Sequence, residues 1–411
     1  MAVRAVVVVL LMACTSVPGD LADDPAATPA VTPAPSATPE PGGELSGRRA
    51  DLEALVEAYE WTHPSPPARL RDRVQALAAR ADDLSSDEFL VEVSRLTAGR
   101  DRDGHTGVFP LGQPDLGIWP LQLYEFDDGW RVIRARPPYR ELVGGKVTAI
   151  GGRPVAQVKR MTTPLVSRDN AATVRGRLPQ YVIVPAVLRG LGLEASLTVD
   201  GRRVVPQPIS TEAYATWADI FYPLVCPRLR APDVPDWAVR RSGDAVVARF
   251  GLVSSLSDDL GIDEFADRVR RLARKTSGPV VIDVRDNPGG DNGTYRALLS
   301  AVVEIARRDP RRLRLVFGRC TFSAATNFAA EVMAETDAVS FGEPMGGSPN
   351  MWGDADEFTL PESGIVLHVA TVKWELGGRD WRPMIKPDVA VPLRWSDYRG
   401  GKDQALRAAR R

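Results

Sequence analysis

The chain contains only three histidines and three cysteines among its 411 residues, and this scarcity limits the chemistry open to it. The histidines are His63, His105 and His368, which are far apart in the sequence. Because histidine and cysteine ligands are not clustered, the sequence implies neither a metal nor an organic cofactor. Three cysteines also cannot form the disulfide framework of a small secreted domain. Any histidine chemistry must therefore use one of these three residues.

Net charge is also nearly absent. The 52 lysines and arginines are balanced by 53 aspartates and glutamates, which gives a net charge of −1 and an isoelectric point near 6.4. Charges of both signs are mixed along the chain, as on an ordinary solvated surface. The composition therefore gives no reason to expect a nucleic acid or an anionic membrane surface as partner.

The N-terminus carries an apolar run that is too short to span a bilayer. Arg4 precedes nine apolar residues, 5–13, a pattern typical of a signal peptide. The segment 11–14 reads Leu-Met-Ala-Cys and resembles the bacterial lipobox, in which Cys14 becomes the lipidated first residue. An ordinary signal peptide with an incidental cysteine is the alternative. We expect export and lipid anchoring to the outer face of the bacterial cell membrane.

The remaining chain divides by composition into four parts. Residues 15–48 are rich in proline, alanine and threonine and predict an extended tether. Residues 49–110 show helical spacing of apolar side chains, with a capping-box pattern at Ser85 and Glu88. Residues 111–235 predict a strand-rich middle region, whose hairpin at 145–155 resembles a fragment of a PDZ domain. Residues 236–411 alternate between strand and helix patterns and predict a layered α/β core.

Within the core, the predicted elements follow the apolar periodicity. The run 280–284 is continuously apolar, as a strand buried on both faces would be. His368 alternates with apolar neighbours and is interpreted as a sheet residue rather than a catalytic one. The predicted strands are 245–252, 280–284, 311–317, 338–341 and 364–372, and the predicted helices are 262–275, 294–308 and 324–334.

Ser323 stands at the turn between a predicted strand and a predicted helix. A serine there lies beside the N-terminal amides of the helix, which stabilise developing negative charge, so it is a candidate nucleophile. Serine is also a favoured helix N-cap, and that simpler interpretation remains open from this segment alone. Gly289 and Gly290 follow the buried strand, at the end of the sheet where ligands of α/β folds bind. One of them, together with the amide of Ala324, would supply the two donors of an oxyanion hole.

Three blocks in this order resemble a known family. They are Asp283-x-Arg285-x-Asn287-x-Gly289-Gly290, then Thr321-Phe322-Ser323-Ala324 with Asn327-Phe328, then Phe341-Gly342-Glu343-x-x-Gly346-Gly347. Together they are similar to the serine peptidases of the C-terminal-processing and tricorn-core type, whose superfamily includes the interphotoreceptor retinoid-binding proteins. The resemblance implies a crotonase/ClpP-like α/β core.

The resemblance also assigns roles to residues. The C-terminal-processing branch uses a lysine base, but Ser348 stands where that lysine would be. The tricorn-like branch uses a histidine next to a segment similar to Asp103-Gly104-His105-Thr106. This implies Ser323 as nucleophile and His105 as general base. The acid that orients the imidazole is then expected to be Asp380, with Glu375 as the second choice.

The sequence therefore predicts an exported serine peptidase that acts on a peptide or protein through an acyl-enzyme. The alternative is a non-catalytic protein on the same scaffold that binds an apolar ligand or a peptide, since fold alone does not fix function. A surface scaffold that engages only cell-wall partners is a third reading. Cys226 and Cys320 have the opportunity to pair in an oxidising compartment, although their spacing does not show that they do.

Overall fold

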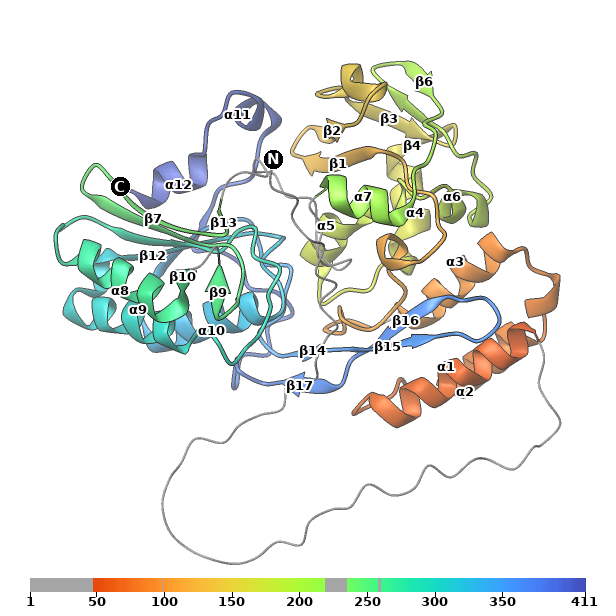
Figure 1. Ribbon diagram of the computed structural model, residues 1–411, viewed down its shortest axis with the longest axis horizontal. Coiled ribbons are helices and arrows are strands. Elements are labelled where there is room, and N and C mark those ends of the chain that lie inside the picture. The colour runs from red at the N-terminus through yellow and green to blue at the C-terminus, as the bar shows by residue number, and fades with distance from the viewer. Residues whose placement is uncertain (1–46, 99, 219–234, 258–259) are drawn as a thin grey trace, which may run out of the picture. The chain divides into compact units, whose positions relative to one another are not determined.

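The computed structural model describes residues 47–98, 100–218, 235–257 and 260–411 (Figure 1). Residues 45–411 belong to one compact unit. The predicted signal segment with Cys14, the predicted tether up to residue 46, and Cys226 lie outside the described residues. Among the described residues, no helix combines the length and the apolar character that a membrane span requires.

The centre of the core is a six-stranded sheet with the order β18-β13-β12-β11-β8-β7. Neighbouring strands are parallel except for β7, which runs antiparallel to β8. The mixed α/β class with a mostly parallel sheet is thus confirmed. The strands are β7 Trp237–Ser242, β8 Ala245–Phe250, β11 Val280–Asp283, β12 Leu313–Phe317, β13 Val339–Gly342 and β18 Val389–Ala390.

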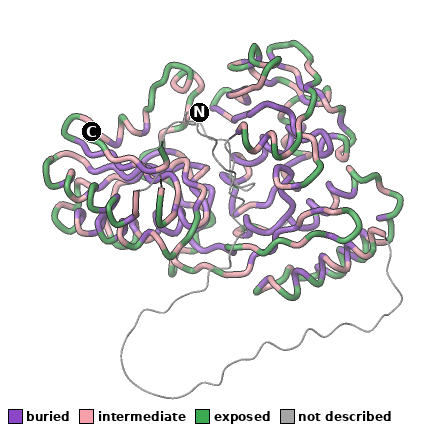
Figure 2. Tube along the Cα trace, viewed as in Figure 1, coloured by how far each residue is buried: buried purple, intermediate pink, exposed green. Residues whose placement is uncertain are grey.

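Both faces of this sheet are covered, which explains why β11 consists of four buried residues rather than an alternating pattern (Figure 2). On one face, Ile282 and Leu315 belong to one apolar cluster with α8, α9 and α10. On the other face, Val281 and Val316 pack with Ala405 of α12. The helices are α8 Ile262–Ala273, α9 Arg296–Arg308, α10 Ala324–Glu335 and α12 Gln404–Ala409 (Figure 1).

The N-terminal region is helical, as predicted. It contains α1 Arg48–Thr62, α2 Leu70–Ala78 and α3 Ser86–Thr97, with short 3₁₀ turns η1 Ala81–Asp83 and η2 Pro110–Gly112. The Ser85 side chain accepts from the Glu88 amide and the Glu88 side chain accepts from the Ser85 amide, so the capping box is confirmed. Asp51 of α1 accepts from the amides of Glu362 and Ser363, which ties this region to the C-terminal part of the chain.

Two antiparallel strand pairs follow the core strand β13. One pairs β14 Met351–Gly353 with β17 Val372–Trp374, and the other pairs β15 Asp356–Thr359 with β16 Val366–Val369. The single strand predicted for 364–372 is thus divided between β16 and β17. His368 lies in β16 and exchanges backbone hydrogen bonds with Gly107. This pairing brings the segment after His105 beside the C-terminal strand pairs.

The middle region differs from the strand-rich prediction. It does contain the hairpin β1 Leu121–Phe126 with β2 Gly129–Ala135, and a four-stranded sheet of β4-β3-β5-β6. The hairpin predicted at 145–155 is present, with Ile150 opposite Arg153. However, three helices lie between β4 and β5, and a fourth helix follows β6. The elements are β3 Val147–Ile150, β4 Arg153–Pro154, β5 Leu197–Val199, β6 Arg202–Val204, η3 Tyr139–Leu142, η4 Thr163–Leu165, α4 Val155–Thr162, α5 Ala171–Tyr181, α6 Pro185–Gly190 and α7 Thr211–Ala218.

For α6, the cause of this error is the apolar run 182–188, which is buried throughout. A segment that is buried on all sides carries no polar face, so its periodicity does not separate a strand from a buried helix. The remaining short elements are β9 Leu256–Ser257, β10 Leu260–Gly261, η5 Pro310–Arg312 and α11 Trp395–Arg399.

The central sheet should dominate the stability of the core. Replacing the fully buried Leu315 by alanine removes packed methyl groups and leaves a cavity between β12 and the helices. We expect the free energy of unfolding to fall by about 2–5 kcal/mol. The matched control, Leu256→Ala, changes a side chain that is 54% exposed and should shift it by less than about 0.5 kcal/mol. Equal losses in urea titrations of both variants would contradict this account of the core.

Candidate active site

Ser323 occupies the turn between β12 and α10. It is a non-glycine residue with φ 52° and ψ −131°, a conformation that costs energy and is found mainly where function requires it. Its side chain makes no capping hydrogen bond to α10, so the interpretation of Ser323 as a simple N-cap is wrong. Ser323 is partly exposed between two buried neighbours, Phe322 and Ala324. The turn therefore presents the hydroxyl rather than burying it against the helix.

His105 contacts Ser323 directly. Its Nε2 lies 3.0 Å from the Ser323 Oγ, and its Nδ1 lies 2.9 Å from the backbone carbonyl oxygen of Trp352. A carbonyl oxygen accepts and never donates, so Nδ1 carries the proton and Nε2 presents its lone pair. The serine hydroxyl then donates to Nε2. This is the tautomer that a general base needs.

A backbone carbonyl thus occupies the place that the sequence predicts for Asp380. The Asp380 carboxylate accepts instead from the guanidinium and amide of Arg382, with its shortest ion-pair distance at 2.6 Å. Glu375, the second choice, pairs with Lys373 at 2.5 Å. The prediction that Asp380 orients the imidazole is therefore wrong, and the Trp352 carbonyl has this role instead. The physical reason is that β14 brings its own backbone to the Nδ1 side of the ring.

The imidazole of His105 is buried and neutral at ordinary pH. Burial, together with the positive charge of Arg177, lowers the pKa of His105 to about 3. The His105 ring stacks on Phe322 at 4.6 Å, and the Arg177 guanidinium lies 4.4 Å from the centre of the same Phe322 ring. Since the pKa in the folded state is lowered, the contribution of this group to stability is present above about pH 6.5. It is lost as the pH falls toward about 3.

Asp103 and His63 form a buried pair beside this site, which the sequence interpretation missed. His63 Nδ1 accepts from the Ser65 amide, so its Nε2 donates to Asp103 Oδ2 at 3.1 Å. The His63 ring lies 4.8 Å from the ring of Trp352, whose carbonyl holds His105. His63 is thus a buried residue paired with Asp103. The only sequence feature that could have indicated this pair was Asp103, an acidic residue two positions before the proposed base His105.

Fewer backbone amides are available as oxyanion donors than the sequence predicts. The Gly289 amide donates to the Asn287 side chain at 2.9 Å, so it is not available. The amides of Gly290 and Ala324 have no acceptor among the described residues. Gly289 still shapes the site, because a Cβ there would lie 2.6 Å from the Ser323 Cβ. A side chain at Gly289 would also crowd the Ala324 nitrogen, 3.0 Å away.

The position of the lysine in a Ser–Lys design carries Ser348, which is buried. Its hydroxyl donates to the carbonyl of Pro383 at 2.7 Å. Lys373 pairs with Glu375 and lies 5.8 Å from the centre of the Trp352 ring. Neither residue contacts Ser323 in the described part of the chain. The geometry therefore follows the serine–histidine design.

The other motif residues brace the ends of the strands. Arg285 donates to both Asp283, at the end of β11, and Asp403, the cap of α12. Arg319 forms a bidentate pair with Glu343 at 2.7 and 2.9 Å. Side chains of opposite charge at adjacent strand ends thus hold the loops on either side of Ser323.

Cys320 is disulfide-bonded, and the other two cysteines, Cys14 and Cys226, lie outside the described residues. Its sulfur is therefore not a thiol nucleophile, which supports Ser323 in that role. Within the described ranges, no group of three or more histidine, cysteine or acidic residues is arranged to hold a metal ion.

Comparison with known proteins locates the fold. No protein-family model matches the chain, and no curated protein matches it in sequence. The structure of mature CPAF complexed with lactacystin matches with a TM-score of 0.57 at 12% identity, over 88% of this chain and 98% of that one. A serine-to-alanine mutant of CPAF matches with a TM-score of 0.59 at 13% identity, over 88% and 96%. The photosystem II D1 C-terminal processing protease matches with a TM-score of 0.40 at 13% identity, over 85% and 94%.

These structural neighbours are serine peptidases of the C-terminal-processing and tricorn type, the group that the sequence motifs resemble. At this level of identity, the CPAF structures show a shared fold. They do not by themselves assign the activity.

The environment of His105 predicts its titration. We expect NMR signals of the His105 ring to show the neutral Nδ1–H form between about pH 5 and 8, because burial opposes the charged form. The Asp380→Asn variant should leave this titration unchanged, since Asp380 pairs with Arg382. An upward or downward shift of the His105 titration in Asp380→Asn would return the orienting role to that carboxylate.

Proposed function

We propose that the protein is an exported serine peptidase that hydrolyses peptide bonds through an acyl-enzyme, with Ser323 as nucleophile and His105 as general base. The observation that carries this proposal is the 3.0 Å contact between Ser323 Oγ and the lone-pair nitrogen of His105. A strained turn holds the serine, and the amides of Gly290 and Ala324 have no acceptor among the described residues. A binding protein would have no need for this combination.

The first half of the reaction forms the acyl-enzyme. Ser323 Oγ attacks the peptide carbonyl while its proton passes to His105 Nε2. The carbonyl oxygen becomes an oxyanion, and the amides of Gly290 and Ala324 are its proposed donors. The imidazolium then gives its proton to the leaving nitrogen, and the carbon–nitrogen bond breaks. Ser323 retains the acyl group as an ester.

The second half regenerates the enzyme. Water attacks the ester carbon, its proton passes to His105, and the protonated imidazole returns a proton to Ser323 Oγ as the product acid leaves. Throughout, the Trp352 carbonyl keeps Nδ1 protonated. Because Arg177 and burial disfavour the imidazolium, the charge on His105 is favoured only while the oxyanion is present. The resting base stays neutral and ready to accept.

The finer assignments belong to the same proposal. We infer a crotonase/ClpP-like layering for the core, supported by the sheet with helices on both faces. Export and lipid anchoring through Cys14 rest on the sequence of residues 1–14 and on the tether composition that follows it. A peptide or protein is the expected substrate, as for the peptidases that share the fold. Nucleic acid is not an expected partner.

A fluorophosphonate serine probe tests the nucleophile. The body, residues 45–411, belongs to one compact unit and should be labelled in its wild-type form. Ser323→Ala should remove labelling completely, and His105→Ala should lower its rate by about 10³-fold or more, because the base no longer accepts the proton. Asp380→Asn should label at nearly the wild-type rate. Its side chain pairs with Arg382 and not with His105.

The outcomes separate the two function classes. Labelling at Ser323 that requires His105 establishes the activated serine, and profiling with peptide libraries then follows. Absence of labelling in a folded wild-type protein would reject the peptidase proposal and favour the non-catalytic binding protein on the same scaffold.

Detergent phase partitioning of the full chain tests the anchor. When expressed in a bacterial host, the full chain should enter the detergent phase, and Cys14→Ser should move it to the aqueous phase or leave it unprocessed. Ser16→Ala, a change two residues away that keeps the Cys14 thiol, is the matched control and should still enter the detergent phase. A Cys14→Ser variant that is processed like the wild type and still enters the detergent phase would contradict lipidation at this residue.

A further inference from the structure

His105 and Ser323 are brought together from distant parts of the chain, and the segment 167–177 contacts both sides of the site. On the histidine side, the Arg102 amide donates to the Asp169 carbonyl at 2.9 Å, and the Gly104 amide donates to Asp169 Oδ1 at 2.8 Å. The residue directly before His105 is thus held by the Asp169 side chain.

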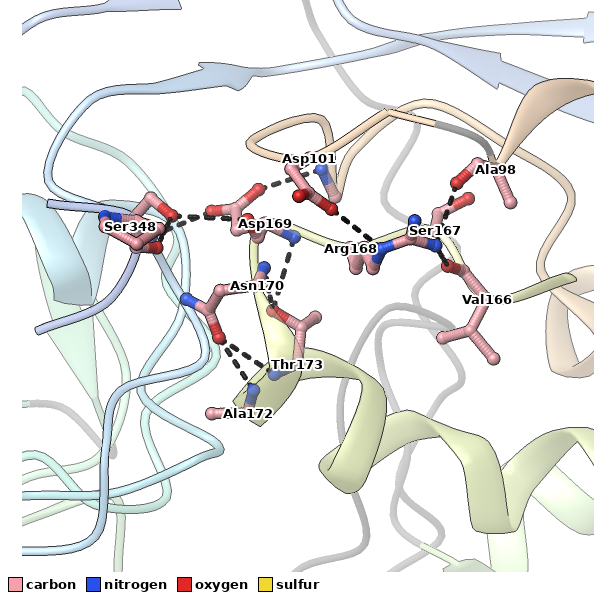
Figure 3. A network of polar contacts seen from close by, with 12 residues as sticks. Ala98, Asp101, Val166, Ser167, Arg168, Asp169, Asn170, Ala172, Thr173 and Ser348 are labelled. Carbon is pink, nitrogen blue, oxygen red and sulfur yellow. Dashed lines mark hydrogen bonds and ion pairs between the residues drawn. The ribbon is translucent and has the colours of Figure 1, made fainter. Parts of the chain in front are cut away.

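The same carboxylate reaches the loop after β13. Its second oxygen, Oδ2, accepts from the Ser348 amide at 3.0 Å (Figure 3). The neighbouring Asn170, which caps α5, donates to the carbonyl oxygen of Gly346 at 3.0 Å. Two adjacent side chains therefore fasten the loop 346–348 to the start of α5.

That loop packs directly behind the nucleophile. The Gly347 amide donates to the Thr321 carbonyl at 3.0 Å, two residues before Ser323. A Cβ at Gly347 would lie 2.0 Å from the Thr326 hydroxyl oxygen, in the first turn of α10. The loop 346–348 therefore packs against the turn that carries Ser323. A displacement of this loop would move the contacts that hold the turn in position.

We propose that Asp169 is the positioning residue of this site: its two carboxylate oxygens clamp the segment of the general base to the loop behind the nucleophile and so set the distance between His105 Nε2 and Ser323 Oγ. The proposal builds on the peptidase function proposed above. It assigns to Asp169 no contact with substrate.

The fit around Asp169 is close. The residue is fully buried, and a Cβ at Gly104 would lie 2.8 Å from its Oδ1 and 3.0 Å from the Phe322 ring. Only glycine at position 104 permits this approach. Arg177 of α5 donates to the Gly104 carbonyl at 2.6 Å, so both polar groups of that residue are held from the same segment.

The clamp titrates in an accessible range. Burial raises the pKa of Asp169 to about 7, against the two backbone donors and Arg177, which lower it, and Asp103, which adds to the rise. The contribution of this group to folding stability is therefore full below about pH 4. It is lost as the pH rises through about 7. Ionised Asp169 accepts with both oxygens, whereas the protonated acid loses one acceptor position to its own proton.

Kinetics and crystal structures of the Asp169→Asn variant of the body, residues 45–411, test the clamp. Asparagine keeps one acceptor and places an NH₂ against the other backbone donor. We expect kcat/KM, or the rate of fluorophosphonate labelling, to fall by about tenfold to hundredfold at pH 8. The wild-type rate should rise through about pH 7 as Asp169 ionises, and the variant should lack this rise. In its crystal structure, Nε2 and Oγ should be beyond hydrogen-bonding distance.

The control is Asp101→Asn, in the segment that precedes His105. Asp101 is an exposed acid that pairs with Arg168 at 2.8 Å and should give wild-type rates and the wild-type pH profile (Figure 3). If Asp169→Asn does not fold, Asp169→Glu keeps the charge but adds a methylene. It should retain the rise near pH 7 at a similarly lowered rate.

The proposal is overturned if a folded Asp169 variant keeps the wild-type rate, or if its crystal structure keeps the contact between Nε2 and Oγ. This structural readout does not need activity. A wild-type protein that fails to react would reject the peptidase function, whereas the distance between the two side chains in Asp169→Asn would still decide the role of Asp169.

Discussion

The hydrogen bond between Ser323 and His105 is the contact on which the arrangement of this protein depends. It joins residues 218 positions apart, so it exists only when the α/β core, the segment after α3 and the strand pair β14–β17 are all in place. No single element contains the site. The parallel sheet supplies the serine turn and the glycine loop, and β14 supplies the carbonyl that orients the imidazole. The fold therefore brings together three segments of the chain that are far apart in the sequence.

Much of the core and the central pair of the site could be predicted from the sequence. The bounds of the helices α8, α9 and α10 and of the strands β8, β11 and β12 were predicted to within a few residues. Each of these elements shows one regular pattern, amphipathic or continuously apolar, along its whole length. Ser323 and His105 were predicted from their motif context. The helix α6 was not predicted, since the buried run 182–188 has no polar face to reveal its period.

The orienting group of His105 could not have been predicted, for a different physical reason. Sequence reasoning searches for side chains of the right chemistry, and every residue has a backbone carbonyl. Only the three-dimensional path of β14 shows that the carbonyl of Trp352 meets Nδ1. Asp380 had the right chemistry and a plausible position, but Arg382, two residues away, binds its carboxylate. The same limit applies to Gly289, whose amide is taken by the nearby Asn287.

Orientation by the Trp352 carbonyl also has a consequence for how this site responds to change. A carboxylate that holds a histidine can be removed by one substitution or neutralised by acid, whereas a peptide oxygen is retained by every amino acid and does not titrate. The information that fixes the tautomer is therefore stored in the course of the main chain rather than in the identity of a residue. Variation at position 352 should act on packing, and selection on this function falls on the pairing of β14 with β17.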